Sequence, residues 1–250
     1  RTLNGGSNWH AYTFGDAQFH RLLDWARLPY PSQTIIALAG NAVMRSSNRG
    51  TSWNMVWGAW DYIVTLQFIR VDPNQPNVVW FGGENGLFHP ILYRSSDSGL
   101  TWQDADTPGK LEDRCHDMAI FRGNSNLAVM PMEGSIQRTE NGGENWTTVL
   151  TNGLYMYSTR IDSLRPNLVY TCGTHIGDPM NIIISRDSGQ TWTTIAGSLE
   201  GVSFIAGMEI LSLWDRNELY FAATTGVLKY TDYFPYICGD ADNSGIVTIL

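Results

Sequence analysis

Short β-rich runs and turns alternate along most of the chain. Within one representative stretch, the apolar runs are separated by turn residues such as Pro, Asn, Asp and Gly, which predicts four strands. We name them A to D, at Val64–Val71, Asn77–Gly82, Ile91–Ser95 and Thr101–Asp104. Four short strands in about 46 residues are typical of one four-stranded antiparallel unit that repeats along a chain.

A box of eight residues marks the turn between strands C and D, and it recurs. The two fullest copies are Ser95–Trp102 (SSDSGLTW) and Ser185–Trp192 (SRDSGQTW). Relaxed copies occur at Ser46–Trp53, at Thr139–Trp146 and, in shortened form, at Asn4–Trp9. The closing tryptophans fall at 9, 53, 102, 146 and 192, in steps of 44, 49, 44 and 46. Such regular spacing predicts a repeat architecture.

The acidic position of the box has a structural interpretation. A short carboxylate in a turn can accept backbone N–H bonds, and the glycine two residues later permits a positive φ. We therefore predict that Asp97, Asn141 and Asp187 hold their turns and take no part in catalysis, because local capping accounts for them. The box tryptophans are expected to pack between neighbouring sheets.

The pattern S-x-D-x-G-x-T-W resembles the Asp-box, or bacterial neuraminidase repeat. This repeat is found in sialidases, xyloglucanase-type glycosidases, sortilin-like receptors and photosystem assembly factors. The resemblance implies an all-β fold, a β-propeller of four-stranded blades over residues 1–235. Five boxes, together with Gly226–Asp232 as the C strand and decayed box of a sixth unit, indicate five to six blades, the first with only its box and D strand. Such propellers close with six or seven blades, so the chain is expected to lack an upstream portion.

A second, short module is predicted at residues 236–250. Cys238–Leu250 resembles the start of a type I dockerin, with oxygen-bearing residues at alternate loop positions and Gly at the sixth, as a Ca²⁺ loop requires. The twelfth position would follow Leu250, so the loop is incomplete in this chain. The resemblance implies calcium, export from a bacterium, and a cohesin or surface-assembly partner; the alternative is an acidic tail without metal. The candidate ligands are Asp240, Asp242, Ser244, the carbonyl of Ile246, and Thr248.

Composition and charge narrow the classes of partner. The chain has 250 residues, 16 basic and 24 acidic side chains, and a net charge of −8, without a Lys/Arg cluster. Binding to nucleic acid or to an anionic membrane is therefore not expected, and no apolar run reaches the roughly 20 residues of a membrane span. The three cysteines, Cys115, Cys172 and Cys238, are predicted to be buried free thiols. The five histidines, at 10, 20, 89, 116 and 175, show no metal-ligand spacing.

The B–C and D–A loops of a propeller lie on one face, around the central channel, and are expected to carry any ligand site. Their aromatic side chains could stack on sugar faces, their acids could accept bonds from hydroxyls, and His175 lies in the same loops. Packing between blades is the competing explanation for each aromatic residue. The candidate ligand-binding residues are Trp57, Trp60, Asp61, Tyr62, Glu84, Tyr155, Tyr157, His175 and Asp178.

Two functions remain open, and so does the question of whether the chain is an enzyme. The favoured one is an extracellular propeller that binds a glycan or a protein, because no catalytic signature is present. The alternative is a glycoside hydrolase on a plant or cell-wall polysaccharide, which needs two carboxyl groups about 5–10 Å apart. No spacing selects a pair from Asp61, Glu84, Asp113, Asp117, Glu133 and Asp178. Phe121–Asn124 (FRGN) departs from the Phe-Arg-Ile-Pro motif of sialidases, which argues against that activity.

Overall fold

The described part of the chain consists of β-strands and turns. The computed structural model describes residues 2, 4–11, 22–59, 64–87, 89–105, 113–175, 178–199, 201–202, 204–223 and 226–234. Within these residues every regular element is a β-strand, in antiparallel sheets whose strands follow one another in chain order. The all-β prediction is therefore confirmed. No helix in the described residues is long and apolar enough to cross a membrane.

Two four-stranded sheets come first. Blade I consists of β1 (Leu22–Arg27), β2 (Ile35–Ala39), β3 (Ala42–Ser46) and β4 (Asn54–Gly58). Blade II consists of β5 (Val64–Val71), β6 (Val79–Asn85), β7 (Pro90–Ser95) and β8 (Gln103–Asp104). Strand A was predicted with its observed bounds. The D strand begins two residues later than predicted, because Thr101 and Trp102 still belong to the box turn.

The third sheet has seven strands and combines two blades. Blade III has β9 (Ala119–Ile120), β10 (Ala128–Pro131), β11 (Glu133–Thr139) and the start of β12 (Thr147–Ile161). Blade IV has the end of β12, β13 (Val169–Thr174), β14 (Met180–Ser185) and β15 (Thr193–Leu199). The strand β12 serves both blades, since its first residues pair with β11 and Tyr155–Ile161 pair with β13.

Blade V has three strands in the described residues: β16 (Ile205–Ser212), β17 (Arg216–Ala223) and β18 (Gly226–Tyr233). The predicted C strand of the sixth unit is β18. Its decayed box is not a turn, however, because Thr231 and Asp232 continue the strand opposite Glu218 and Asn217. Asp232 accepts a hydrogen bond from the Tyr170 hydroxyl at 2.7 Å, so it connects blade V to blade IV.

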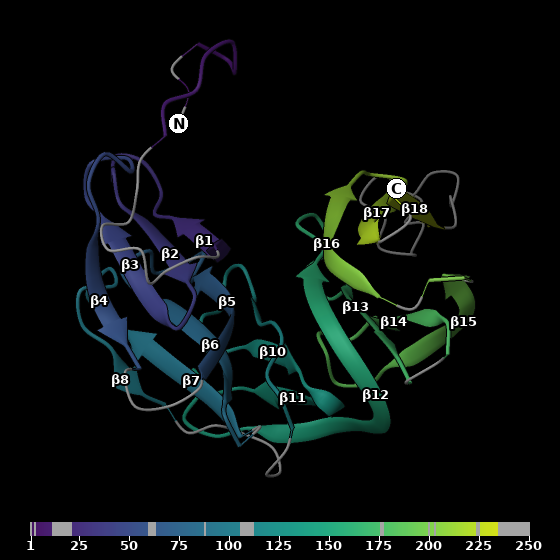
Figure 1. The fold of residues 1–250 in the computed structure, drawn as a ribbon. Helices are drawn as coiled ribbons and strands as arrows, with labels where there is room; N and C mark the ends of the chain where they lie inside the picture. Colours follow the sequence, from purple (N-terminus) through teal and green to yellow (C-terminus); the bar gives the residue numbers. More distant parts are fainter. Residues whose placement is uncertain are drawn as a thin grey trace, which may run out of the picture.

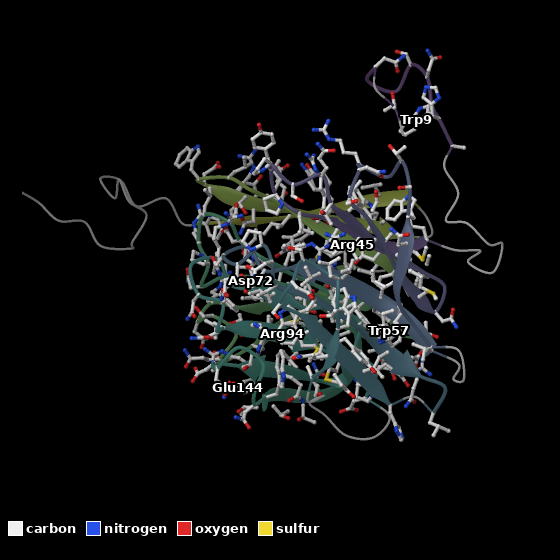
Figure 2. All side chains as sticks on the ribbon, turned by 90° about the vertical axis from the view of Figure 1, so that its left-hand side faces the viewer. Trp9, Arg45, Trp57, Asp72, Arg94 and Glu144 are labelled. Atoms are coloured by element: carbon white, nitrogen blue, oxygen red, sulfur yellow. The ribbon has the colours of Figure 1, made fainter. Side chains whose placement is uncertain are left out.

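The blades follow one another around an arc, with blades I and V at its two ends (Figure 1). The A strands β1, β5, β12 and β16 face the inside of the arc. The box turn at residues 4–9 lies apart from the sheets, and its Trp9 is 72% exposed (Figure 2). Residues 10 and 11, where the first D strand was expected to begin, are not in a strand, and most of that expected strand lies outside the described residues.

The apolar core lies between adjacent sheets. One cluster joins Ile36 and Leu38 of blade I to Phe81 of blade II, and Trp102 packs edge-on against Phe81 with 4.8 Å between ring centroids. Trp192 likewise packs against Val129 of blade III. These two box tryptophans pack where neighbouring sheets meet, as predicted. The prediction is wrong for Trp9, whose side chain is 72% exposed because its turn lies apart from the sheets.

The box turns are held by the side chains that the sequence indicated. Asp97 accepts backbone N–H bonds from Leu100 at 3.0 Å and Thr101 at 2.9 Å. Asp187 accepts the equivalent bonds from Gln190 at 3.0 Å and Thr191 at 2.8 Å. Asn141 accepts the one from Asn145 at 2.9 Å. The capping interpretation of these residues is confirmed.

Two of the three cysteines lie in the described residues, and both are buried free thiols, as predicted. Complete burial raises the pKa of Cys172 to about 12 and that of Cys115 well above its usual range. Neither thiol is therefore available as a thiolate nucleophile near neutral pH. Cys238 lies outside the described residues.

Candidate functional site

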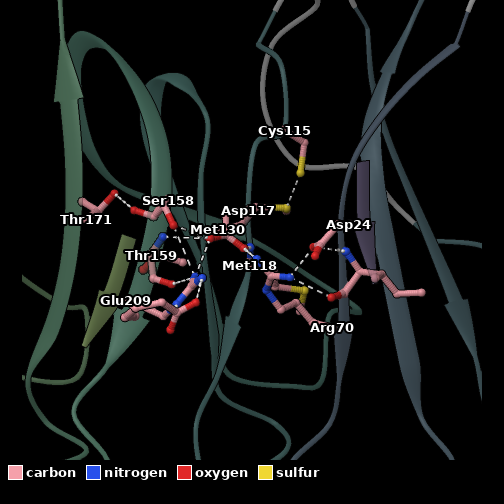
Figure 3. A network of polar contacts seen from close by, with 12 residues as sticks. Asp24, Arg70, Cys115, Asp117, Met118, Met130, Ser158, Thr159, Thr171 and Glu209 are labelled. Atoms are coloured by element: carbon pink, nitrogen blue, oxygen red, sulfur yellow. Dashed lines mark hydrogen bonds and ion pairs between the residues drawn. The ribbon is translucent and has the colours of Figure 1, made fainter. Parts of the chain in front are cut away.

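A row of alternating charges crosses the inside of the arc, with one residue from each blade (Figure 3). We call it the charge ladder; it consists of Asp24, Arg70, Asp117, Arg160 and Glu209. Arg70 contacts Asp24 at 2.6 Å and also pairs with Asp117. Arg160 contacts Asp117 at 2.9 Å and Glu209 at 2.8 Å. The ladder ties the five inner strands or their leading segments together through ion pairs.

Asp117 is the centre of the ladder. Its carboxylate also accepts bonds from the backbone N–H of Met118 at 2.8 Å and of Thr159 at 2.9 Å, and from the Ser158 hydroxyl at 3.0 Å. Burial raises the pKa of this carboxyl, but the adjacent Arg70 and Arg160 and the backbone N–H bonds together lower it below its usual value. Asp117 is therefore a charged structural group rather than a proton donor at neutral pH.

Hollows of about 460 Å³ lie on both sides of the ladder. The first, the D–A hollow, is bordered by the beginnings of the A strands, including Leu23, Gln67, His116, Tyr157 and Ala206. The second, the A–B hollow, is bordered by the ends of the A strands and the turns that follow them. Ligand sites usually occupy about 300–1,000 Å³, so each hollow is large enough for a small ligand or a sugar unit.

Two carboxyl groups from neighbouring blades share one arginine, and the group adjoins the D–A hollow through His116, which borders that hollow. Arg114 forms an ion pair with Glu84 through Nε, with 2.7 Å between Nε and Oε2, and a second with Glu133 through Nη1, at 3.3 Å. His116 Nε2 lies 3.3 Å from the same Glu133 oxygen. The Glu84 and Glu133 side chains are only 12% and 15% exposed. We call Glu84, Arg114, His116 and Glu133 the carboxyl cluster.

The sheet geometry explains why these side chains converge. Glu84 is near the end of β6, and Glu133 begins β11, so both stand where their blades turn toward the D–A face. The backbone N–H of Glu133 donates to the Arg114 carbonyl at 3.1 Å. The backbone of Cys115 forms an isolated antiparallel β-bridge with that of Met132, so Arg114 and His116 lie beside the start of β11. Local pairing thus fixes three of the four members of the cluster.

The surroundings of the cluster raise the pKa of one of its two carboxyl groups. Burial raises the pKa of Glu84; the charge of Glu133 raises it further, and Arg114 and His116 compensate only in part. A carboxyl group with a raised pKa beside a second carboxylate is the arrangement that separates a general acid from a base. This cluster could therefore exchange protons with a bound ligand.

Two predicted aromatic residues adjoin the cluster. Tyr155 is the register partner of both Glu133 and Thr174. The Tyr157 ring lies 5.5 Å from the His116 ring and 5.7 Å from Phe204, measured between centroids. Burial, and then the charge of Glu133, raise the pKa of Tyr157. Glu84, Tyr155 and Tyr157, all sequence-predicted site residues, therefore come together with Glu133.

Other predicted residues do not join this group. Trp57 packs against Phe81 at 5.0 Å and Tyr93 at 5.1 Å, which is the packing between blades that the sequence left as its alternative. His175 and Asp178 are exposed in the β13–β14 connection, where the Asp178 N–H donates to the His175 carbonyl at 3.1 Å. The remaining predictions fall outside the described residues: Trp60, Asp61, Tyr62, Asp240, Asp242, Ser244, Ile246 and Thr248.

Sequence reasoning did not single out Arg114, and it assigned His116 no site. The signal was the alternation in Arg114-Cys115-His116-Asp117, where a buried thiol separates polar residues immediately before an A strand. The described residues hold no group of three or more His, Cys, Asp or Glu side chains arranged for a metal ion.

Comparison with known proteins relates the chain to carbohydrate-acting enzymes. It is 22% identical to a xyloglucanase of Hypocrea jecorina over 216 residues, which is 78% of this chain and 23% of that protein. It is 24% identical to an oligoxyloglucan-reducing end-specific xyloglucanase of Emericella nidulans over 166 residues, 58% of this chain and 19% of that protein. The chain thus spans about a quarter or less of the length of these relatives. No protein-family profile matches it.

Solved structures confirm the propeller fold. An ancestral GH74 enzyme aligns with a TM-score of 0.73 at 15% identity, over 86% of this chain and 31% of that one. The BP39L lectin from Burkholderia pseudomallei aligns with a TM-score of 0.63 at 11% identity, over 86% of this chain and 67% of that one. Identities this low show the fold, which both an enzyme and a lectin use.

Proposed function

We propose that this chain is the propeller part of an exported glycoside hydrolase that acts on a xyloglucan-type plant polysaccharide and binds the glycan over the D–A hollow. The observation that carries the proposal is the pair Glu84 and Glu133, held by one arginine beside that hollow. The two xyloglucanase relatives support the substrate class. The sequence alone favoured a propeller that only binds its ligand. We now propose its alternative, a glycoside hydrolase.

Each residue of the site has a role in this proposal. Glu84, with its raised pKa, protonates the leaving oxygen, and Glu133 acts as base or nucleophile. Tyr155 and Tyr157 provide aromatic surface for a sugar ring. Arg114 holds the two carboxyl groups in place, and it must release one of them when the glycan enters.

A second candidate function, glycan binding without hydrolysis, is favoured by the ion pairs of Arg114. Arg114 pairs with both carboxyl groups at once, which neutralises the charges that hydrolysis would use. In a binding site the same three groups would instead donate and accept hydrogen bonds with sugar hydroxyls.

The experiment measures xyloglucan oligosaccharide binding by calorimetry and the release of reducing ends in parallel. We expect Glu84→Gln to lower kcat by about 10²–10⁴-fold while oligosaccharide binding persists. Glu144→Gln, an exposed acid at the blade III box, is the matched control. Binding by the unaltered chain without any hydrolysis would select the second candidate, and the absence of both would overturn the site.

The proposal also covers the repeat family of the propeller and the C-terminal residues. The side-chain capping of these turns supports an Asp-box propeller, and we propose that residues 236–250 begin a dockerin-like calcium loop that attaches the protein to a cohesin or surface assembly. Calcium titration of this chain should give weak heat that disappears in the Asp240→Asn/Asp242→Asn double variant, because these acids supply the charge of the loop. Identical heat from both proteins would count against the loop.

A further inference from the structure

The A–B hollow lies across the charge ladder from the carboxyl cluster and has a different character. Its volume is about 460 Å³, and the described residues that line it include four arginines and one acid, Asp162. The arginines are Arg27, Arg70, Arg122 and Arg160. A positive lining of this kind is unexpected in a protein with a net charge of −8.

The charges of the lining are not all available to a ligand. Arg70 and Arg160 are paired with the carboxylates of the charge ladder. Asp162 is completely buried; it accepts a bond from Asn217 at 2.8 Å and pairs with Arg165 at 3.0 Å. Its charge is therefore compensated away from the hollow.

Arg27 and Arg122 differ from the other two arginines. Both are exposed, and within the described residues neither forms an ion pair or a side-chain hydrogen bond. Arg27 ends β1 of blade I, and Arg122 lies in the turn after β9 of blade III, so they reach the hollow from two different blades. Free guanidinium groups are suited to carboxylate and sulfate groups, which they bind in a bidentate way.

An aromatic surface stands in the same hollow. Trp25 is 57% exposed, although it lies on the inner strand of blade I and its backbone N–H is held by Asp24 at 2.8 Å. An exposed indole on an inner strand is not explained by core packing, and an indole can cover the face of a flat or ring-shaped ligand. The polar residues Thr159 and Ser163 border the same space.

We propose that the A–B hollow is a second glycan site, specific for an acidic sugar, in which Arg27 and Arg122 bind the anionic group and Trp25 covers the ring. The ligand class is a uronic acid unit of a polysaccharide, which presents a carboxylate. A sulfated sugar presents a similar anionic group and is the second source of such a ligand. The charge ladder separates this site from the D–A hollow, so the two sites bind independently, and the proposal does not depend on hydrolysis.

The test is calorimetric titration of the protein with a trisaccharide of galacturonic acid, its neutral galactose counterpart and a sulfated galactose trisaccharide. We expect saturable binding of an acidic trisaccharide and at least tenfold weaker binding of the neutral one. The Arg27→Gln/Arg122→Gln and Trp25→Ala variants should each weaken acidic binding at least tenfold. Raising NaCl from about 0.05 M to about 0.5 M should weaken it several-fold, because exposed charge pairs are screened.

Matched controls keep the result specific. Arg49→Gln and Trp214→Ala remove an exposed arginine and a 65% exposed tryptophan outside this hollow and should leave acidic binding unchanged. Glu84→Gln should also leave it unchanged, which separates this site from the proposed hydrolytic one. Binding of the sulfated trisaccharide alone would support the site and identify sulfate as its anion. Equal binding of the neutral trisaccharide, no binding of either acidic one, or full binding by the Arg27→Gln/Arg122→Gln variant would overturn the proposal.

Discussion

The carboxyl of Asp97 illustrates how a side chain in a turn couples stability to pH. Its partial burial raises the pKa, but hydrogen bonds from the Thr101 hydroxyl and backbone, from Ser95 and from Leu100 outweigh that effect and lower it to about 2, from an ordinary 3.8. A carboxyl with a lowered folded-state pKa stabilises the fold above its unfolded pKa, and this contribution is lost as the pH falls through the folded pKa.

We therefore expect the stabilisation from Asp97 to disappear between about pH 4 and pH 2. The Asp97→Asn variant should lose less stability over this interval, since Asn48 and Asn141 already cap equivalent turns without a charge. Denaturant midpoints of both proteins, measured at several pH values, provide the comparison. Parallel pH dependence of the two midpoints would show that Asp97 does not carry the effect.

Removing a cap tests the same turns at neutral pH. Asp187→Ala deletes the acceptor of the Gln190 and Thr191 N–H bonds and should cost about 0.5–2 kcal/mol of unfolding free energy, by analogy with other side-chain caps. Glycan binding should be unchanged in the folded variant, because Asp187 borders neither the D–A hollow nor the A–B hollow. A variant that keeps its melting temperature but loses binding would contradict the structural assignment.

The box glycines connect one blade to the preceding one. Gly189 has a φ of +81°, and a Cβ there would stand 2.6 Å from Val129 Cγ1 in blade III. Gly123 has a similar φ of +86° but no atom within 4 Å of its Cβ position. Gly189→Ala should therefore destabilise the protein more than Gly123→Ala, by about 1–3 kcal/mol, the usual cost of forcing extra volume into a packed site. Thermal unfolding of both variants measures this difference. Equal destabilisation would mean that the contact between Gly189 and blade III relaxes without cost.

Strands were predictable where local sequence determines them. Val64–Val71 was found from its apolar run and flanking turn residues, and the box turns from Asp, Gly and Trp at fixed offsets. The continuous β12 was not predicted: Tyr155 and Tyr157 were expected in a loop between two blades, whereas both lie within the strand. The strand persists because its two ends pair with different partners, β11 and β13, and pairing partners are not visible in a single sequence.

The candidate site was predictable only in part, because it is assembled by the arrangement of the whole molecule. The loop topology placed Glu84, Tyr155 and Tyr157 on the D–A face, and the structure joins Glu133 to them. No sequence spacing indicates that Arg114 reaches carboxyl groups of two blades, since Glu84 lies 30 positions before it and Glu133 19 after it. The charge ladder differs in this respect: its members alternate in sign along the chain at steps of 46, 47, 43 and 49 positions, close to the steps between the box tryptophans, so the repeat carried a signal that sequence reasoning did not use.

The charge ladder gives a prediction for the molecule as a whole. Asp117→Ala leaves Arg70 and Arg160 facing each other without their shared carboxylate, and breaking a buried pair in this way typically costs about 3–5 kcal/mol. Glu209→Gln removes the outer end of the same row, where the glutamate side chain is 76% exposed, and should cost about 0–1 kcal/mol because solvent screens that pair.

Equilibrium denaturation of the two variants, with near-ultraviolet circular dichroism as a second probe, measures this difference. If Asp117→Ala fails to fold, Asp117→Asn keeps the volume and part of the hydrogen bonding and should rank between the other two. Similar stability of Asp117→Asn and Glu209→Gln would show that the blades are held by their apolar interfaces alone. The expected ranking would instead assign the ladder a share in keeping the inner strands, and with them both hollows, in place.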